Sequence, residues 1–316
     1  MRLEYQILVA LALDCFLGDP RWFPHPVRAI GRVAAALERP IRRLIPSPRL
    51  AGTITSVLVI GTTAGLSWFV VALCAEQSPV AGIMATALLI YSTIALRDLV
   101  QHAQEVYRAL TEDNLEAARA RVGRIVGRDT EHLSESEVAR AAVESVAESI
   151  VDGVTAPLFY AIIAGPVGAM AYRATNTLDS TFGYLNEQHR DFGWASARLD
   201  DVANYIPARL TAPIIGLAAL LLRLHAKKSI RMVLRDARKH ASPNAGFAES
   251  AVAGALGVQL GGLNYYFGKP SRKPTLGDPE EPMAPDHILQ ATRLAVTASL
   301  LFAALGLLGR IGLGAV

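Results

Sequence analysis

Two long runs without a charged side chain constrain the fold of this chain more than any other feature. They cover residues 51–75 and 79–96, and as α-helices they would reach roughly 27 to 37 Å at about 1.5 Å per residue. The hydrocarbon core of a bilayer is about 30 Å thick, so both runs can cross a membrane. The composition agrees, because 52% of the 316 residues are hydrophobic, 19% are charged and the mean hydropathy is +0.30. We therefore expect an all-α fold, a polytopic membrane helical bundle.

Four further apolar runs are interrupted by charges or by helix breakers. They cover residues 3–18, 150–171, 206–222 and 294–316. Pro157, Gly165 and Pro166 interrupt the second run. Arg209 and Pro213 interrupt the third. Such interruptions favour re-entrant or broken helices, which are tolerated where protein or water satisfies the backbone. Ordinary buried helices are the alternative for each run.

Basic residues predict the topology. Residues 19–50 and 223–240 are rich in arginine and lysine, which places both in the cytoplasm under the positive-inside rule. We interpret them as lipid-facing clusters and expect no nucleic-acid partner. Between them, residues 97–147 have the spacing of amphipathic helices, and S-E-S-E at 134–137 predicts a capping box.

This pattern predicts a single integral-membrane domain over residues 1–316 that includes a short cytoplasmic amphipathic helical hairpin. Its expected parts outside the bilayer are a helical insertion at 97–149 and a basic and polar segment at 223–293, both in the cytoplasm. A re-entrant segment at 150–171 would place the polar segment 172–204 in the cytoplasm as well, which we favour, whereas a single crossing there would place it outside.

A stripe of carboxylates enters one of the interrupted apolar runs. Glu144, Glu148 and Asp152 are spaced i, i+4, i+8, so an α-helix places them on one face. Ionised groups beside a bilayer or a dry core are costly, and acids there usually bind something. The pattern A-E-S-x-V-x-G occurs at residues 147–153 and again at 248–254. It is either a chance match in Ala-rich sequence or a sign that two comparable helices frame one site.

A second polar group follows the apolar run at 150–171. Arg173, Asn176 and Asp179 share one face if this segment is helical. The arginine suits a phosphate or carboxylate, and the aspartate suits Mg²⁺ or an ammonium group. A simple helix cap by Thr177 or Asp179 is the alternative.

A proline-rich loop follows the first apolar run. Asp14, Asp19 and His25 lie in or beside it and could hold a cation or transfer a proton. A rigid interfacial turn with Trp22 and Phe23 among the headgroups is the alternative.

The usual nucleotide and zinc motifs are missing. No P-loop precedes Lys269, and the seven histidines have no metal-ligand spacing. A turn at residues 242–249 opens a helix at which backbone N–H groups can receive an anion.

Four motifs in order give the chain a resemblance to the adenosylcobinamide-phosphate synthases of cobalamin biosynthesis over nearly its whole length. The motifs are G-D-P at 18–20 with H-P-V at 25–27, E-S-V-A-E-S at 144–149 with D-G at 152–153, R-A-T-N-T-L-D at 173–179, and S-P-N-A-G at 242–246. The resemblance implies a multi-pass enzyme of the bacterial or archaeal inner membrane whose active site faces the cytoplasm. It also implies ATP-dependent amide ligation of a corrinoid, adenosylcobyric acid, to (R)-1-amino-2-propanol or its O-phosphate.

The implied cofactors are ATP and Mg²⁺, and the residues offer a compatible mechanism through an acyl phosphate. The expected catalytic residues are Glu148, Asp152, Asp179 and Arg173. Those expected to hold the metal are Glu144, Glu148 and Asp179. Those expected to bind substrate or cofactor are Asp14, Asp19, His25, Asn176, Asn244 and Glu249.

A secondary membrane transporter or carrier is the alternative function, because broken helices with charges and a repeated motif are typical of that class. The sequence leaves open whether the amine arrives phosphorylated, which acid is the base, and whether the chain forms a homo-oligomer.

Overall fold

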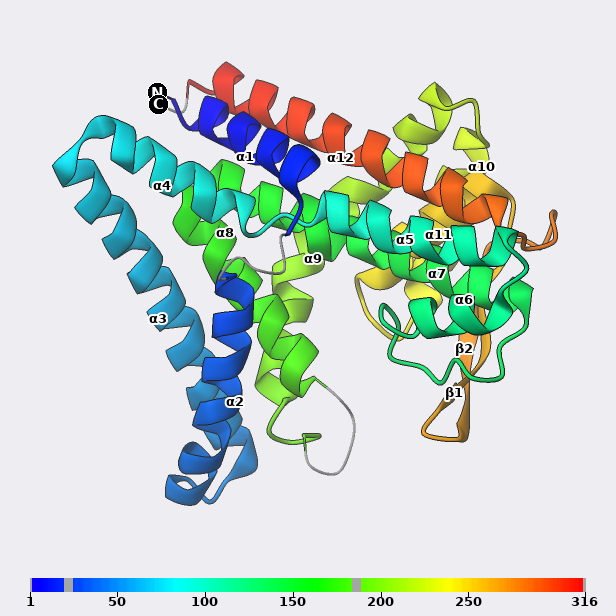
Figure 1. The fold of residues 1–316 in the computed structure, drawn as a ribbon, viewed down its shortest axis with the longest axis horizontal. Coiled ribbons are helices and arrows are strands. Elements are labelled where there is room, and N and C mark those ends of the chain that lie inside the picture. The colour runs from blue at the N-terminus through cyan, green and yellow to red at the C-terminus, as the bar shows by residue number, and fades with distance from the viewer. Residues whose placement is uncertain (1, 20–24, 184–188, 315–316) are drawn as a thin grey trace. The chain divides into compact units, whose positions relative to one another are not determined.

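The computed structural model describes residues 2–19, 25–183 and 189–314 (Figure 1). The chain divides into two compact units, and the single integral-membrane domain stays a prediction. The first unit contains Met1–Ala95, Ala156–Asn204 and Gly306–Val316, and the second contains Leu96–Thr155 and Tyr205–Leu305. Of the segments predicted to be cytoplasmic, 97–149 and 223–293 lie in the second unit, whereas 19–50 and 172–204 belong to the first. Their side of the membrane stays a prediction.

Five helical segments within the described residues are long and apolar enough to cross a membrane. They are Pro48–Gln77, Pro79–Thr111, Glu135–Phe182, Trp194–Leu221 and Asp286–Gly312. Both charge-free runs are among them, which confirms the expected polytopic helical membrane fold. The first apolar run forms α1 (Leu3–Leu17), whose 15 residues are fewer than such a span needs.

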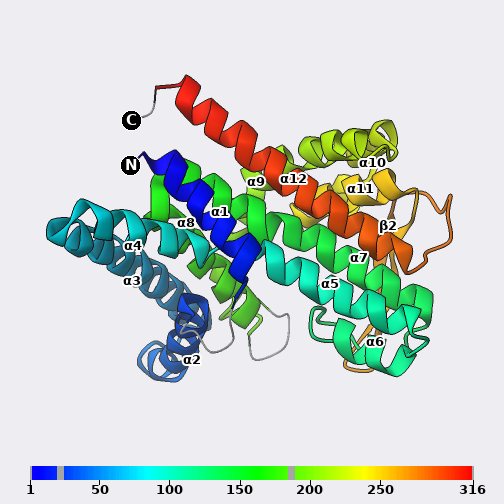
Figure 2. The ribbon, with the colours of Figure 1, turned by 45° about the horizontal axis from the view of Figure 1, so that its top comes forward.

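The first unit is built around α1, α2 (Pro26–Leu44), α3 (Pro48–Gln77), α4 (Pro79–Tyr91) and α8 (Ala156–Phe182). In Figures 1 and 2, α3 and α4 form a helical hairpin. Ser78 begins α4 because its hydroxyl accepts a hydrogen bond from the Ala81 N–H at 3.1 Å. The buried core of this unit includes Ile30, Ala34, Ile41, Val59, Met170, Leu178, Phe182 and Phe192.

Gly52 of α3 marks a close approach of two backbones. A Cβ atom there would lie 1.8 Å from the carbonyl oxygen of Phe192. We expect Gly52→Ala to lower the free energy of unfolding by about 2 kcal/mol, because the backbone must shift to remove the overlap. Thermal unfolding in detergent measures the effect. Gly61→Ala on the same helix is the matched control, since nothing lies within 4 Å of its Cβ position and alanine favours a helix. Equal stability of the two variants would contradict the prediction.

One of the two predicted helix interruptions is present. The backbone of α8 is non-helical at Gly165, where φ is 62°, as expected of a broken helix. By contrast, α9 (Trp194–Leu221) continues through both of its prolines. The prediction that Arg209 and Pro213 break this segment is therefore wrong, because a proline removes one hydrogen bond but its φ suits a helix.

Pro157 affects the backbone in the turn that precedes it. Between α7 (Glu135–Ile150) and α8 the chain forms a π-helical turn, η1 (Val151–Thr155). Proline at 157 cannot donate to the carbonyl of Gly153 and its ring crowds that carbonyl. A wider turn at this point relieves the crowding.

The second unit combines helices with a small hairpin of strands. Its elements include α5 (Leu96–Thr111), α6 (Leu115–Val122), α7, α10 (Ala226–Asp236), η2 (Ala237–Lys239), α11 (Ala245–Leu256), β1 (Leu260–Tyr266) and β2 (Lys269–Leu276); α12 (Asp286–Gly312) begins in it and ends in the first unit. The capping box at Ser134 and Glu137 is confirmed. Residues 97–147 contain the helices α5, α6 and most of α7, and their role as a cytoplasmic amphipathic hairpin stays a prediction.

The antiparallel hairpin of β1 and β2 was not predicted. Its two-residue turn has positive φ at Phe267 (53°) and Gly268 (73°), the conformation that suits tight hairpins. The Asp129 carboxylate accepts hydrogen bonds from both turn amides, at 3.0 and 2.7 Å. Pro270 and Pro274 in β2 argue against a strand in sequence reasoning, but this strand pairs on one side only.

Candidate functional site

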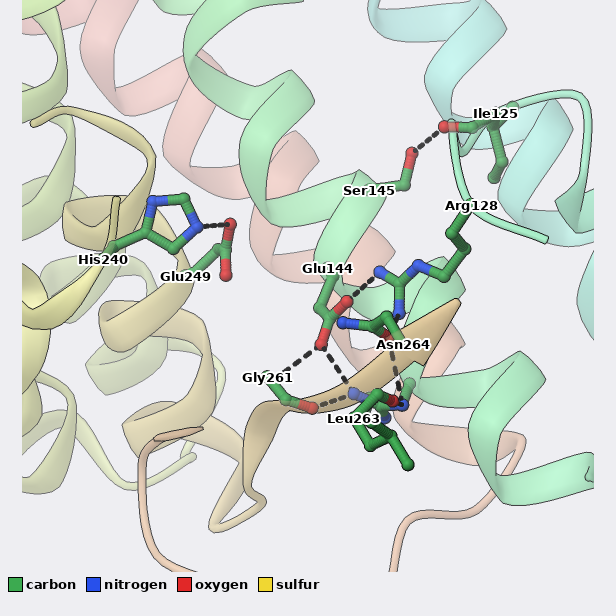
Figure 3. Close-up of polar contacts among 10 residues, drawn as sticks. Ile125, Arg128, Glu144, Ser145, His240, Glu249, Gly261, Leu263 and Asn264 are labelled. Carbon is green, nitrogen blue, oxygen red and sulfur yellow. Dashed lines mark hydrogen bonds and ion pairs between the residues drawn. The ribbon is translucent and has the colours of Figure 1, made fainter. Parts of the chain in front are cut away.

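Both units contain groups of interacting polar side chains that include predicted site residues. Figure 3 shows polar contacts of the second unit around Glu144 and Glu249.

Glu144 lies on α7 with 5% of its surface exposed. Its Oε2 atom accepts a hydrogen bond from Arg128 Nη2. Its Oε1 atom accepts one from the Gly261 N–H at 2.7 Å and lies 3.5 Å from Arg140 Nη1 (Figure 3). Two arginines and a backbone amide thus occupy both carboxylate oxygens and join α7 to the start of β1. Because these donors already occupy the Glu144 oxygens, Glu144 is a poor ligand for Mg²⁺. Glu148 and Asp179 are the better candidates for that role.

Asn264 extends the same contacts into the hairpin. Its Oδ1 atom accepts hydrogen bonds from Arg128 and from Arg140, the latter at 3.4 Å. The side chain is 1% exposed, and its Nδ2 atom has no hydrogen-bond partner among the described residues. A buried amide donor without a partner is uncommon and requires an explanation.

Glu249 on α11 faces His240 at the end of η2. The His240 Nε2 atom lies 3.6 Å from Glu249 Oε1 (Figure 3). The side chains are 10% and 7% exposed. The Nδ1 atom of His240 accepts a hydrogen bond from the Ser242 N–H at 3.0 Å, so the proton of the neutral ring is on Nε2 and points toward Glu249.

Charges from several elements meet at Glu249. Burial, followed by the charges of Glu148 and Glu144, raises the pKa of the Glu249 carboxyl well above its ordinary value. Burial alone would lower the pKa of Lys273 on β2, but Tyr266 and the three glutamates together raise it. We call Glu144, Glu148 and Glu249 the glutamate cluster.

The repeated motif A-E-S-x-V-x-G therefore has a structural counterpart. Its two copies lie at the junction of α7 with η1 and on α11, and α7 packs against α11. Glu148 and Glu249, the glutamates of the two copies, interact electrostatically. Asp152 lies in the π-helical turn, so the regular α-helical spacing that placed it on the stripe ends at Ile150.

Two backbone N–H groups of the turn before α11 already donate hydrogen bonds within the turn. The Ser242 hydroxyl accepts hydrogen bonds from the N–H groups of Asn244 and Ala245, both at 3.2 Å. The predicted site residue Asn244 is 6% exposed and its Oδ1 atom accepts from Arg209 Nη1 at 3.2 Å. Two of the amides that could receive an anion here are thus engaged by Ser242.

In the first unit, the predicted residues of α8 join a network with α9. Arg173 Nη1 donates to Asn176 Oδ1 at 3.4 Å, and Asn176 Nδ2 donates to Asp200 Oδ1 at 3.3 Å. Asn204 Nδ2 donates to Asp200 Oδ2 at 2.9 Å, and its Oδ1 accepts from the Tyr172 hydroxyl at 2.9 Å. The expected shared face of Arg173 and Asn176 is confirmed, and Asp200 connects it to α9.

Asp179 lies one turn further along α8 and is half-buried. The alternative interpretation as a helix cap is wrong for Thr177, because α8 continues to Phe182 and the Thr177 hydroxyl donates to the Arg173 carbonyl. Asp179 also lies within the helix, so its carboxylate does not begin one.

Two of the predicted residues at the loop after α1 lie close together. His25 Nε2 lies 3.8 Å from Asp19 Oδ1, and Arg28 Nη2 donates to that same oxygen at 3.3 Å. Asp14 lies on α1 and is 1% exposed. The predicted headgroup contacts of Trp22 and Phe23 fall outside the described residues.

Within the part of the chain that the structure describes, no group of three or more histidine, cysteine, aspartate and glutamate side chains is arranged to hold a metal ion. Mg²⁺ often uses only one or two protein carboxylates together with substrate phosphates. The magnesium and ATP predictions therefore stay predictions.

Sequence reasoning missed the basic partners of the glutamate cluster. Arg128, His240 and Lys273 come from three separate segments, and no spacing rule relates them to α7. Ion-pair partners this distant in sequence give no local signal.

The fold and these polar groups define a multi-pass helical membrane protein with charged residues buried beside its apolar helices. Comparisons with known proteins add the family. A model of the CobD/CbiB proteins matches residues 7–295, so the chain belongs to the CobD/CbiB family of cobalamin biosynthesis proteins.

The relatives are similar over most of their length. The cobalamin biosynthesis protein CobD of Geobacter metallireducens is 51% identical over 88% of this chain and 87% of its own. That of Leptospira interrogans is 47% identical over 95% of both chains. The cobalamin biosynthesis protein CbiB of Salmonella typhi is 45% identical over 98% of both. No solved structure matches the chain.

Proposed function

We propose that this protein is an adenosylcobinamide-phosphate synthase, which joins the carboxylate of adenosylcobyric acid to (R)-1-amino-2-propanol or its O-phosphate in an ATP-dependent reaction. Family membership supports the pathway. The observation that carries the chemistry is the glutamate cluster, in which two acids of a repeated motif lie beside Lys273 and His240. Amide ligation requires acids and cations of this kind.

The proposed reaction has two steps. A carboxylate oxygen of the corrinoid attacks the γ-phosphorus of ATP and ADP leaves, which gives an acyl phosphate. The amine nitrogen then attacks the acyl carbon, the bond to phosphate breaks, and phosphate leaves with the electron pair. Mg²⁺ held by Glu148 or Asp179 would neutralise phosphate charge. Arg173 would bind a phosphate oxygen and Asn176 would orient substrate.

Purified protein in nanodiscs tests the proposal through ATP-dependent amide formation. We expect Glu148→Gln and Asp179→Asn each to lower kcat/KM about 100-fold, because each removes a charge that serves the reaction. Glu135→Gln, on the exposed first turn of α7, is the control and should retain wild-type activity.

Full activity in both site variants would contradict the assigned roles of these acids. No turnover with any corrinoid would refute the ligase itself, and substrate accumulation in proteoliposomes without ATP would then support a carrier.

A further inference from the structure

Arg310, near the end of α12, makes two contacts that the proposed reaction does not use. Its Nε atom donates a hydrogen bond to Glu4 Oε1 at 3.0 Å, and its Nη1 atom donates one to the Ile162 carbonyl at 2.7 Å. The side chains of Arg310 and Glu4 are 16% and 8% exposed. All three residues belong to the first unit, and Figures 1 and 2 show the end of α12 beside the start of α1. Burying an ion pair is costly, so this one requires an explanation.

The Ile162 carbonyl lies just before the bend of α8. Gly165 has φ 62° and ψ −153°, a conformation that favours glycine. The rings of Tyr160 and Tyr172, on either side of the bend, stack with their centroids 5.2 Å apart. In a straight helix, residues twelve positions apart are separated by roughly 18 Å. The chain therefore turns back at Gly165, and we call residues 156–164 the first limb and residues 166–182 the second limb of α8.

Arg310 supplies a hydrogen bond that the sequence of this turn lacks. In a continuous helix the Ile162 carbonyl would accept from the N–H of residue 166, but Pro166 has none. The Arg310 guanidinium donates to that carbonyl instead, and a cation at the last turn of a helix also interacts favourably with its dipole. Gly306 of α12 permits the close approach, because a Cβ atom there would lie 2.5 Å from Ile162 Cδ1. Arg310 thus caps the first limb.

Glu4 holds the guanidinium at this position. Its Oε1 atom accepts from Arg310, and its Oε2 atom has no hydrogen-bond partner among the described residues. A buried carboxylate of this kind depends on its counter-charge. The planar guanidinium can bind the carboxylate and the Ile162 carbonyl at the same time, which suits arginine better than lysine. One side chain therefore connects α1, α8 and α12.

The second limb carries Arg173 and Asn176 of the proposed site. Both limbs also contact α9, where the Tyr160 hydroxyl donates to the Ala203 carbonyl at 3.0 Å and the Tyr172 hydroxyl donates to Asn204 Oδ1 at 2.9 Å. The turn itself is held by Arg310. Arg173 lies about 12 Å along the helix from Gly165, so a rotation of about 5° at the turn moves it by about 1 Å. A displacement of that size can lower a rate about 100-fold.

We propose that Arg310, held by Glu4, is a positioning residue that fixes the turn between the limbs and thereby places Arg173 and Asn176. The effect on catalysis rests on the proposed function, whereas the effect on the turn does not. Neither Arg310 nor Glu4 is a catalytic residue in this proposal.

Two variants separate the position of the second limb from the stability of the fold. Arg310→Met removes the cap and leaves Glu4 without its counter-charge. We expect kcat/KM for ATP in nanodiscs to fall about 10- to 100-fold and the melting temperature in detergent to fall as well. The double variant Glu4→Gln with Arg310→Met contains neither buried charge, so it should regain most of the melting temperature. Its Ile162 carbonyl still lacks a donor, and kcat/KM should therefore stay low.

Arg49→Met is the matched control in the same unit. Arg49 Nε also pairs with a carboxylate, that of Asp191 at 2.9 Å, but the two side chains are 65% and 51% exposed. Its loss should keep both the melting temperature and kcat/KM close to those of wild type, because exposed pairs contribute little.

A distance measurement tests the turn without catalysis. Spin labels at Phe159→Cys and Ser180→Cys, after both native cysteines are replaced by serine, report the angle between the limbs by pulsed electron paramagnetic resonance. Protein with Arg310 should give one narrow distance, shorter than the roughly 31 Å of a straight helix. The double variant should broaden or lengthen this distance, and Arg49→Met should leave it unchanged.

Recovery of kcat/KM together with the melting temperature in the double variant would overturn the proposal, because Arg310 would then only stabilise the fold. A label distance that stays the same without Arg310 would overturn it as well. If wild type forms no amide, the ligase proposal fails, and the label distance alone decides whether Arg310 fixes the turn.

Discussion

Arg128→Met is expected to lower the free energy of unfolding by about 3–5 kcal/mol, because it leaves the Glu144 carboxylate buried without its main counter-charge. Arg128 is 8% exposed and Glu144 is 5% exposed. The same substitution removes a hydrogen bond to Asn264 Oδ1, so two buried acceptors lose a donor. Denaturant unfolding in detergent, followed by circular dichroism, measures the change.

The double variant Arg128→Met with Glu144→Gln separates the lost ion pair from simple loss of packing. Removing both charges takes away the uncompensated carboxylate, so this variant should regain a large part of the stability. Lys228→Met is the matched control, since Lys228 and Glu280 are paired but 37% and 43% exposed, and exposed pairs contribute about 0–1 kcal/mol. Equal effects of Arg128→Met and Lys228→Met would contradict the structural role of the buried pair.

Hydropathy predicted the membrane-spanning elements because a bilayer sets both the length and the polarity of a helix that crosses it. The charge-free runs became α3 and α4. The local sequence also predicted the start of α7 at Ser134 correctly, because a capping box needs only four consecutive residues. Such features depend only on residues that are close together in sequence, so a single sequence is enough to predict them.

The parts that could not be predicted depend on contacts between distant segments. Proline suggested breaks in α9, yet this helix continues through both of its prolines, because the φ of proline suits a helix. The hairpin of β1 and β2 depends on the Asp129 carboxylate, which lies far from its turn in sequence. Likewise, the sequence predicted the acidic face of α7. Only the fold shows that Glu144 pairs with Arg128 and that Glu249 faces His240.

Asp236→Asn is the second substitution with a large expected effect, about 3 kcal/mol near pH 7. The Asp236 side chain is 0% exposed. It accepts hydrogen bonds from Arg235 Nε and Nη2, both at 2.7 Å, from Lys239 Nζ at 2.6 Å and from the Gly277 N–H at 2.8 Å. Each bond to the charged carboxylate contributes roughly 1.5–3 kcal/mol before desolvation is subtracted. Together they join the end of α10 to the end of β2.

The pH dependence of stability tests this assignment. Burial alone would raise the pKa of Asp236, but Arg235, Lys239 and the Gly277 amide outweigh it and hold the pKa far below its ordinary value. The stabilisation is therefore complete above about pH 4, where the unfolded carboxyl is also ionised, and it declines as the pH falls below that value. Wild type should lose stability over this range, and Asp236→Asn should lose less.

Asp278→Asn is the control for the Asp236 measurement, because Asp278 also pairs with Arg235 but is 46% exposed. Its loss should cost under about 1 kcal/mol. An Asp236→Asn variant with wild-type stability and an unchanged acid profile would show that these hydrogen bonds do not hold α10 to the hairpin.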